Sequence, residues 1–127
     1  MNALDTTEQD RILTGVLDGW ADAIRTHEPD RVAAHFTEDA IFQGFDLVRT
    51  IGRPGIAAYY DKQPLGLTAS FTILERRQIS DDALLVYADV DFALPDGIVI
   101  PVHLTGVLLN TDGSWLISHY HVSKIGA

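Results

Sequence analysis

The chain has 127 residues, of which 46% are hydrophobic, and a formal net charge of -9 at pH 7. This length suits one domain with one core, and the acidic balance excludes binding to a nucleic-acid backbone, which needs clustered Lys and Arg. The absence of cysteine excludes disulfides and zinc–thiolate sites.

The chain carries no sign of membrane insertion or export. No apolar run approaches the roughly 18 residues that a membrane span needs, and the segment from Met1 to Asp5 lacks the basic and apolar regions of a signal peptide. We therefore expect a cytoplasmic protein that forms a single domain over residues 1–127. No nucleic-acid partner, membrane partner, metal or cofactor is expected.

The N-terminal part of the sequence predicts helices. Apolar residues recur at helical spacing over residues 12–24, with Thr6 as the expected N-cap and Gln9 as its capping-box partner. Pro29 ends this helix and opens a short second helix over about residues 30–36. A strand is predicted to follow this second helix.

The remaining elements are one helix and a set of strands. The first predicted strand covers Ala40–Phe45. A third helix is predicted to start at Gly52 and to run through Tyr60. Short turn signals separate four further predicted strands, which indicates an antiparallel meander. These strands are Ser70–Ile79, Leu84–Leu94, Ile98–Asn110 and Ser114–Ile125. Helices followed by a sheet place the chain in the α+β class, with a curved, mainly antiparallel sheet wrapped around three N-terminal helices.

Alternation along these strands separates an apolar inner face from a mixed outer face. The outer face is expected to carry Asp89 opposite His103 and His103 opposite His121, a row that could form a metal site or an acid–base relay. Cross-strand pairing on an outer face explains the same row without chemistry. Trp115 and Ile117 are expected on this face too, and a self-complementary dimer contact would cover them.

Two segments carry a family resemblance. Residues 112–123 read DGSWLISHYHVS, and residues 36–40 read FTEDA, before a strand. The first is similar to the closing strand of SnoaL-like domains and of the association domain of calcium/calmodulin-dependent kinase II. The chain thus resembles the nuclear transport factor 2-like superfamily, also called ketosteroid-isomerase-like. This resemblance implies a cone-shaped roll with a pocket between sheet and helices, often dimeric through the outer sheet face.

The resemblance also implies positions for catalytic groups, and this chain departs from them. Ketosteroid isomerases place a Tyr on the first helix, where this sequence has Trp20. Their general-base Asp matches Gly44, and their second Asp falls near Leu104 or Thr105. The isomerase mechanism is therefore not expected here, although Asp46 could replace the base if its loop turns inward.

The sequence offers candidates for both catalysis and binding. The catalytic candidates are Asp46, His35 and His121. Because Tyr59 and Tyr60 are adjacent on a helix, one of them is expected to be partly exposed. Ser118 and Tyr120, two residues apart, are expected to be polar groups on an apolar wall. The full set of candidate ligand-binding residues is Trp20, Phe36, Phe42, Tyr59, Tyr60, Val90, Leu104, Ser118 and Tyr120.

Three functions remain open from the sequence. The first is a proton-transfer enzyme of isomerase, cyclase or dehydratase type that acts on a small, mainly apolar molecule. The second is a non-catalytic binder of such a molecule. The third is an oligomerisation module in which the cavity is incidental. A homodimer through the outer sheet face is compatible with all three.

Overall fold

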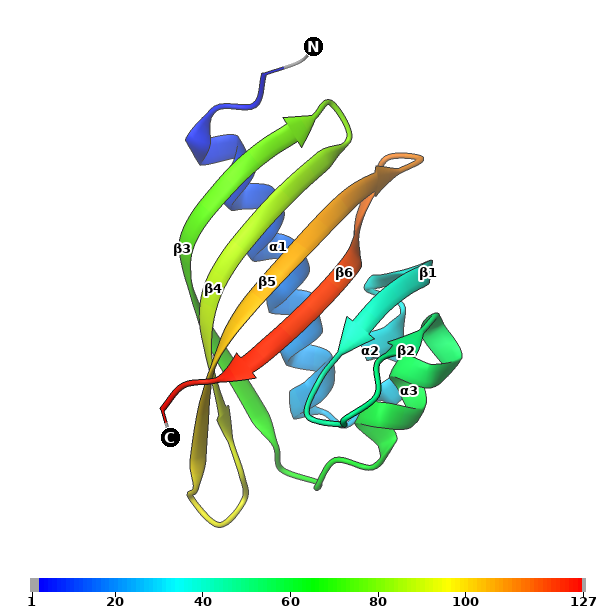
Figure 1. Ribbon diagram of the computed structural model, residues 1–127, viewed down its shortest axis with the longest axis vertical. Coiled ribbons are helices and arrows are strands. Elements are labelled where there is room, and N and C mark those ends of the chain that lie inside the picture. The colour runs from blue at the N-terminus through cyan, green and yellow to red at the C-terminus, as the bar shows by residue number, and fades with distance from the viewer. Residues whose placement is uncertain (1–2, 127) are drawn as a thin grey trace.

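A computed structural model describes residues 3–126 and shows an α+β architecture (Figure 1). The helices are α1 (Thr6–Arg25), α2 (Pro29–Ala33) and α3 (Arg53–Asp61). Six strands form one mixed sheet in the order β2-β1-β6-β5-β4-β3. They are β1 (Phe36–Gln43), β2 (Thr50–Ile51), β3 (Thr68–Ser80), β4 (Ala83–Ala93), β5 (Val99–Thr111) and β6 (Ser114–Lys124).

Helix α1 lies along the concave face of the sheet and buries its apolar stripe there (Figure 1). Leu13, Leu17 and Trp20 are buried on this stripe. The expected N-cap was wrong: Thr6 is the first helical residue, and Asp5 caps the helix by accepting a 2.8 Å hydrogen bond from the backbone N–H of Glu8. Asp5 has extended backbone angles, which place its carboxylate over the first turn.

The region between α1 and α3 differs most from the prediction. Helix α2 ends at Ala33, and Phe36 starts strand β1 instead of ending a helix. The carbonyl of His35 accepts a 2.8 Å hydrogen bond from the N–H of Ile117, which draws the chain onto β6. Strand β1 runs parallel to β6, and the four strands predicted as an antiparallel meander, β3 to β6, form one. The two-residue strand β2 was not predicted, because two residues carry no period.

A β-bulge in β6 changes the faces that alternation predicts for this strand. Leu108 pairs with Ile117, whereas its neighbour Val107 pairs with His119, and Ser118 is left without a partner on β5. One extra residue on one strand reverses the alternation beyond it. Before the bulge the inner face therefore carries odd-numbered residues, and after it even-numbered ones.

The bulge corrects two expectations about the outer face. Ile117 is only 2% exposed and lies in the core, and Trp115 packs against the core, so neither belongs to the outer face. His103 pairs with Ser123 and not with His121. The ends of β3 to β6 lie within two residues of the predicted ends, and the faces of β4 and β5 match the prediction, because their turns and alternation are regular.

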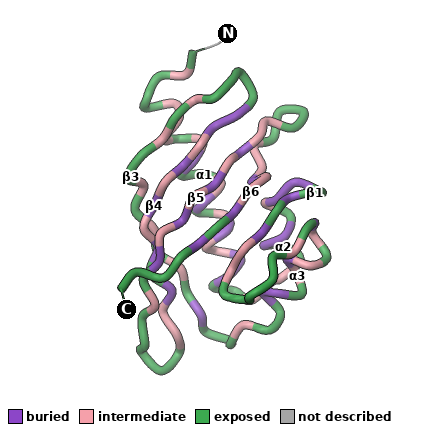
Figure 2. Tube along the Cα trace, viewed as in Figure 1, coloured by how far each residue is buried: buried purple, intermediate pink, exposed green. Residues whose placement is uncertain are grey.

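Buried residues recur along the central strands of the sheet (Figure 2), and aromatic rings fill the core between the sheet and the helices. Phe42 stacks on Tyr120 at 4.5 Å between ring centroids, and Phe36 meets both rings edge-on. Trp20 contacts Tyr120 from α1 at 5.9 Å. These contacts join β1, β6 and α1 into one packed unit. Within residues 3–126, no helix is long and apolar enough to cross a membrane.

The bulge register can be tested by two neighbouring substitutions. We expect Ile117→Ala to lower the free energy of unfolding by about 2–5 kcal/mol, because it leaves a cavity in the core. Leu116→Ala, on the partly exposed face, should cost less than about half as much. Urea unfolding measures both. A larger loss for Leu116→Ala would contradict the bulged register.

Candidate functional site

An apolar cavity of about 60 Å³ lies between α3 and the end of the sheet where β6 finishes. Its walls come from α3, the inner faces of β4, β5 and β6, and the loops that precede β2 and β3. We call it the inner cavity. It is lined by Phe45, Tyr59, Tyr60, Gln63, Leu67, Phe92, Leu94, Ile100, Tyr120 and Val122.

The hydroxyl of Tyr60 is the centre of a buried polar group beside this cavity. The indole N–H of Trp20 donates a 3.1 Å hydrogen bond to it, and a second hydrogen bond joins it to the Tyr120 hydroxyl. A phenol oxygen accepts two hydrogen bonds and donates one. We assign the Tyr120 hydroxyl as the donor of the second bond, which leaves Tyr60 its own proton for an acceptor in the cavity.

Burial fixes the charge state of the cavity hydroxyls. Loss of solvent raises the pKa of Tyr60 and of Tyr120 well above the usual value of a phenol. Burial also raises the pKa of Tyr59, although the hydrogen bond from Phe45 opposes this shift. All three phenols therefore stay neutral near pH 7, so they act as hydrogen-bond donors and not as bases.

A second, more open depression of about 240 Å³ lies between α3 and the β1–β2 loop. We call it the outer cleft. The carboxylate of Asp46 pairs there with Lys62 at 3.0 Å, and both side chains are more than half exposed. The outer cleft is lined by Phe42, Gly44, Asp46, Val48, Thr50, Gly55, Ala58, Tyr59 and Lys62.

Tyr59 belongs to both spaces and separates them. Contrary to expectation, Tyr59 and Tyr60 are both buried. This is possible because α3 is covered on two sides: Tyr60 faces Trp20 of α1, and Tyr59 faces the β1–β2 loop at Phe45. A helix covered on one side only would have exposed one of them.

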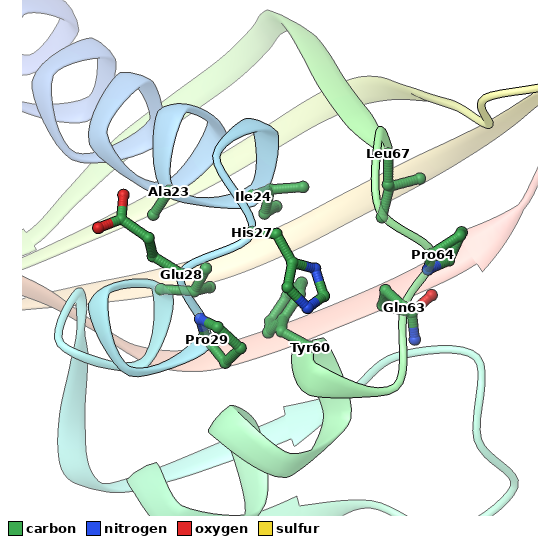
Figure 3. A pocket seen from close by; sticks show the side chains of 10 residues that line it. Ala23, Ile24, His27, Glu28, Pro29, Tyr60, Gln63, Pro64 and Leu67 are labelled. Carbon is green, nitrogen blue, oxygen red and sulfur yellow. The ribbon is translucent and has the colours of Figure 1, made fainter.

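A third hollow adjoins the inner cavity but is too small for a ligand (Figure 3). It lies beside the end of α1 and shares Tyr60, Gln63 and Leu67 with the inner cavity. Its volume is about 10 Å³, which is roughly the space of one water molecule. His27 lines this hollow and does not line the inner cavity.

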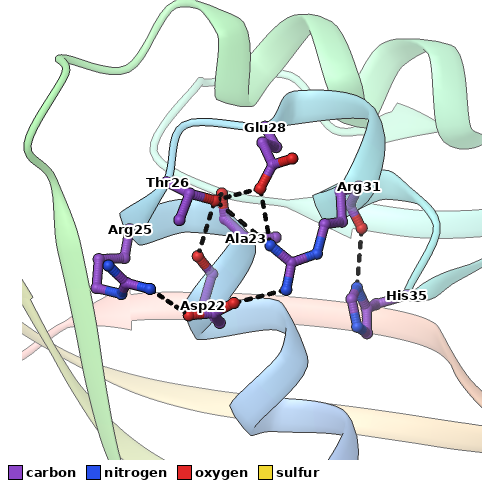
Figure 4. Close-up of polar contacts among 7 residues, drawn as sticks. All are labelled: Asp22, Ala23, Arg25, Thr26, Glu28, Arg31 and His35. Atoms are coloured by element: carbon purple, nitrogen blue, oxygen red, sulfur yellow. Dashed lines mark hydrogen bonds and ion pairs between the residues drawn. The ribbon is translucent and has the colours of Figure 1, made fainter.

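The structure keeps the three catalytic candidates apart. Asp46 lies in the outer cleft, and His121 is exposed on the outer sheet face beside Thr105. His35 lies just after α2, with its Nδ1 2.9 Å from the carbonyl of Arg31 and its ring against Gly19 (Figure 4). None of these side chains lines the inner cavity.

Near His35, ion pairs between charged side chains link the end of α1 to α2 (Figure 4). Asp22 accepts hydrogen bonds of 2.6 Å from both Arg25 and Arg31, and Glu28 pairs with Arg31 at 2.8 Å. The hydrogen bond from Arg31 is the main cause that lowers the pKa of Asp22. Each charged group of this cluster has an oppositely charged partner and is exposed to solvent, so the cluster stabilises the contact between α1 and α2 at the surface.

The ligand-binding candidates divide into three groups. Tyr59, Tyr60 and Tyr120 line the inner cavity, and Ser118 is a partly exposed residue in the β6 bulge. The other five are core residues, of which one also reaches the outer cleft: Trp20, Phe36, Phe42, Val90 and Leu104.

Several lining residues were not among the candidates. Phe92, Ile100 and Val122 follow the inner-face alternation, so their direction was predicted but not their position beside the cavity. Phe45 and Gln63 come from connecting segments. Loops have no period that could indicate which side chains turn inward.

The predicted pairing of Asp89 with His103 on the outer face is confirmed. His103 Nδ1 lies 2.7 Å from a carboxylate oxygen of Asp89, and the His103 ring stacks on Tyr87. Among residues 3–126, no group of three or more His, Cys, Asp or Glu side chains is placed to hold a metal ion.

Comparison with known proteins identifies the family. A profile described as the SnoaL-like domain matches residues 14–127. This chain belongs to the SnoaL-like domain family. Among curated proteins, none matches the sequence.

Solved structures agree with the fold of this SnoaL-like domain. A Xanthomonas campestris protein named for the calcium/calmodulin-dependent protein kinase II association domain aligns with a TM-score of 0.83 and 22% identity, over 98% of this chain and 93% of that one. A ketosteroid isomerase-like protein from Erwinia carotovora atroseptica gives 0.73 and 21%, over 94% and 98%. A hexachlorocyclohexane dehydrochlorinase gives 0.79 and 16%, over 91% and 84%. At these identities they show the shared cone-like fold.

The structure shows how this SnoaL-like domain uses two residues, Trp20 and Gly44, that the resemblance sets against catalytic positions of ketosteroid isomerases. Trp20 directs its only donor to Tyr60 within the core. At Gly44, a Cβ atom would lie 2.5 Å from the Tyr59 hydroxyl, so no larger residue fits while Tyr59 keeps this place.

The raised pKa values predict alkaline destabilisation. Folded Tyr60 and Tyr120 keep their protons at a pH where the unfolded chain has lost them, so folding stability should fall as pH rises above about 10. Urea unfolding from pH 8 to 11 should show a shallower fall for Tyr60→Phe than for wild type. Tyr87→Phe, on the outer face, should keep the wild-type slope. If stability falls with pH at the same slope in all three proteins, the raised pKa of Tyr60 would be refuted.

Proposed function

We propose that this SnoaL-like protein binds a small, mainly apolar molecule in the inner cavity. The proposal rests on the buried Tyr60 hydroxyl beside an apolar wall, which accepts a hydrogen bond from Trp20 and, with Tyr120 assigned as the donor of the second bond, keeps one proton to donate. A ligand with one hydrogen-bond acceptor, such as a carbonyl oxygen, and an apolar body fits this arrangement. Ligand pockets commonly have this composition, mostly apolar with a few converging polar groups.

Binding is better supported than proton transfer. Among the described residues, those that line the inner cavity include no carboxylate and no imidazole, and their phenols are held neutral. A proton-transfer reaction would need a base, for which the nearest candidate in an adjoining space is Asp46 in the outer cleft. The similar structures named for a dehydrochlorinase and a ketosteroid isomerase-like protein keep an enzyme as the second candidate.

The binding proposal is tested by a ligand titration and by a substitution that fills the inner cavity with a larger side chain. We expect acetophenone, which has a carbonyl acceptor on an apolar ring, to stabilise the wild-type protein and to release heat on titration. Ile100→Trp places an indole in the cavity and should abolish this binding. Ile98→Trp is the matched control, because Ile98 lies two residues away and is largely exposed outside the cavity. Binding that survives Ile100→Trp would contradict the proposed site.

We also propose a homodimer through the outer sheet face. Ile41, Val107 and Leu85 lie in one cross-strand row on this face, with His119 between the first two. Ile41 is 44% exposed on the single chain, and apolar side chains gathered in such a row favour a protein contact. The cytoplasmic location expected from the sequence stays a prediction.

The dimer is tested by a charge in the middle of this row. We expect light scattering to give twice the chain mass for wild type and the single mass for Val107→Glu, because two carboxylates would face each other across the contact. Thr111→Glu, at the exposed end of β5, is the control and should stay dimeric. A monomeric wild-type protein would refute this proposal.

A further inference from the structure

Among the described residues, Tyr59 is the one that lines both the inner cavity and the outer cleft. Its side chain therefore forms part of the wall between the two spaces. Its ring lies 4.8 Å from the ring of Phe42 and 5.1 Å from that of Tyr60, centroid to centroid. Moving this one ring would therefore join two spaces that are now separate.

The same tyrosine holds the loop between β1 and β2. Its hydroxyl accepts a 3.0 Å hydrogen bond from the backbone N–H of Phe45. The ring edge also rests on the backbone at Gly44, where a Cβ atom would approach its carbon Cζ to 2.5 Å. Phe45 lines the inner cavity and Val48 lines the outer cleft, so this loop bounds both spaces.

Few other contacts hold the loop in place. Gln43 donates a hydrogen bond to the carbonyl of Asp46, and Lys62 pairs with the exposed Asp46 carboxylate. Leu47 is fully exposed and Val48 is 71% exposed. A segment with few buried contacts opens at low free-energy cost, so the tip of this loop is weakly held. The base of the loop is held at Phe45, by the hydrogen bond to Tyr59 and by the Phe45 ring, which meets Phe92 edge-on at 5.8 Å.

The volumes of the inner cavity and the outer cleft also favour a single site made of both. Ligand pockets typically measure about 300–1,000 Å³, and neither the inner cavity of about 60 Å³ nor the outer cleft of about 240 Å³ reaches this range. Joined, they would reach its lower end. The joined space would have a neutral donor at Tyr60 and, at the opposite end, apolar surface from Val48 and Ala58 beside the exposed Asp46–Lys62 ion pair.

We propose that the inner cavity and the outer cleft are two compartments of one ligand site, with Tyr59 as the gate between them. The ligand class is an elongated, mainly apolar molecule. Its acceptor atom meets Tyr60, and its apolar tail extends past Tyr59 into the outer cleft. This inference rests on the proposed function, because it assumes that the inner cavity binds the acceptor end.

A pair of ketones with the same head group tests the second compartment. In calorimetric titrations, 4′-hexylacetophenone should bind wild type at least about tenfold more tightly than acetophenone, because its tail is buried in the outer cleft. Val48→Trp fills that cleft and should remove this gain while leaving acetophenone binding unchanged. Leu47→Trp, the neighbouring fully exposed position outside both spaces, should keep the gain.

The gate itself is tested by Tyr59→Phe, which removes the hydroxyl and keeps the ring. Association of 4′-hexylacetophenone in stopped-flow measurements should become several-fold faster, and the amide hydrogen of Phe45 should exchange faster. Unchanged association and exchange rates would overturn the gate.

The outcomes separate the two proposals. A tail gain that survives Val48→Trp would overturn the two-compartment site and leave the inner-cavity function standing. Acetophenone binding that persists in Ile100→Trp, or no binding to wild type, would overturn both.

Discussion

The hydrogen bond from the indole of Trp20 to the hydroxyl of Tyr60 joins α1 to α3 across the core, and the arrangement of the site depends on it. Both side chains are buried, so neither polar group can turn to water without disrupting the packing around it. Tyr120 adds a second hydrogen bond from β6. Three elements that are far apart in the sequence are thus held around one oxygen atom.

This polar contact also sets the chemistry of the inner cavity. Trp20, which the resemblance sets against a tyrosine of ketosteroid isomerases, uses its donor inside the core. The donor that faces the cavity comes instead from α3, at Tyr60. Because burial keeps this phenol neutral, the site suits recognition of an acceptor atom better than removal of a proton.

Much of the fold was predictable because its signals are local. The stripe on α1, the turns between β3 and β6 and the alternation on β4 and β5 each arise from short segments. The errors arose where a distant contact decides the structure. Pairing with β6 turns Phe36 into a strand residue, and the extra residue at Ser118 moves Ile117 into the core. Neither effect leaves a period in the sequence.

The candidate site was less predictable than the fold for the same reason. The aromatic residues on regular elements were recognised as inward-facing, but whether Trp20 or Tyr60 borders empty space depends on how helices pack on the sheet. Phe45 and Gln63 enter the cavity from loops. Gly44, which seemed only to lack a carboxylate, is small because the Tyr59 ring lies against it.

A crystal structure of the protein soaked with acetophenone would test the central claim most directly. The account predicts ligand density in the inner cavity, with the carbonyl oxygen about 2.5–3.0 Å from the hydroxyl oxygen of Tyr60. It also predicts that the contact between Trp20 and Tyr60 is unchanged. Density elsewhere, or a ligand in the cavity whose oxygen points away from Tyr60, would contradict the account.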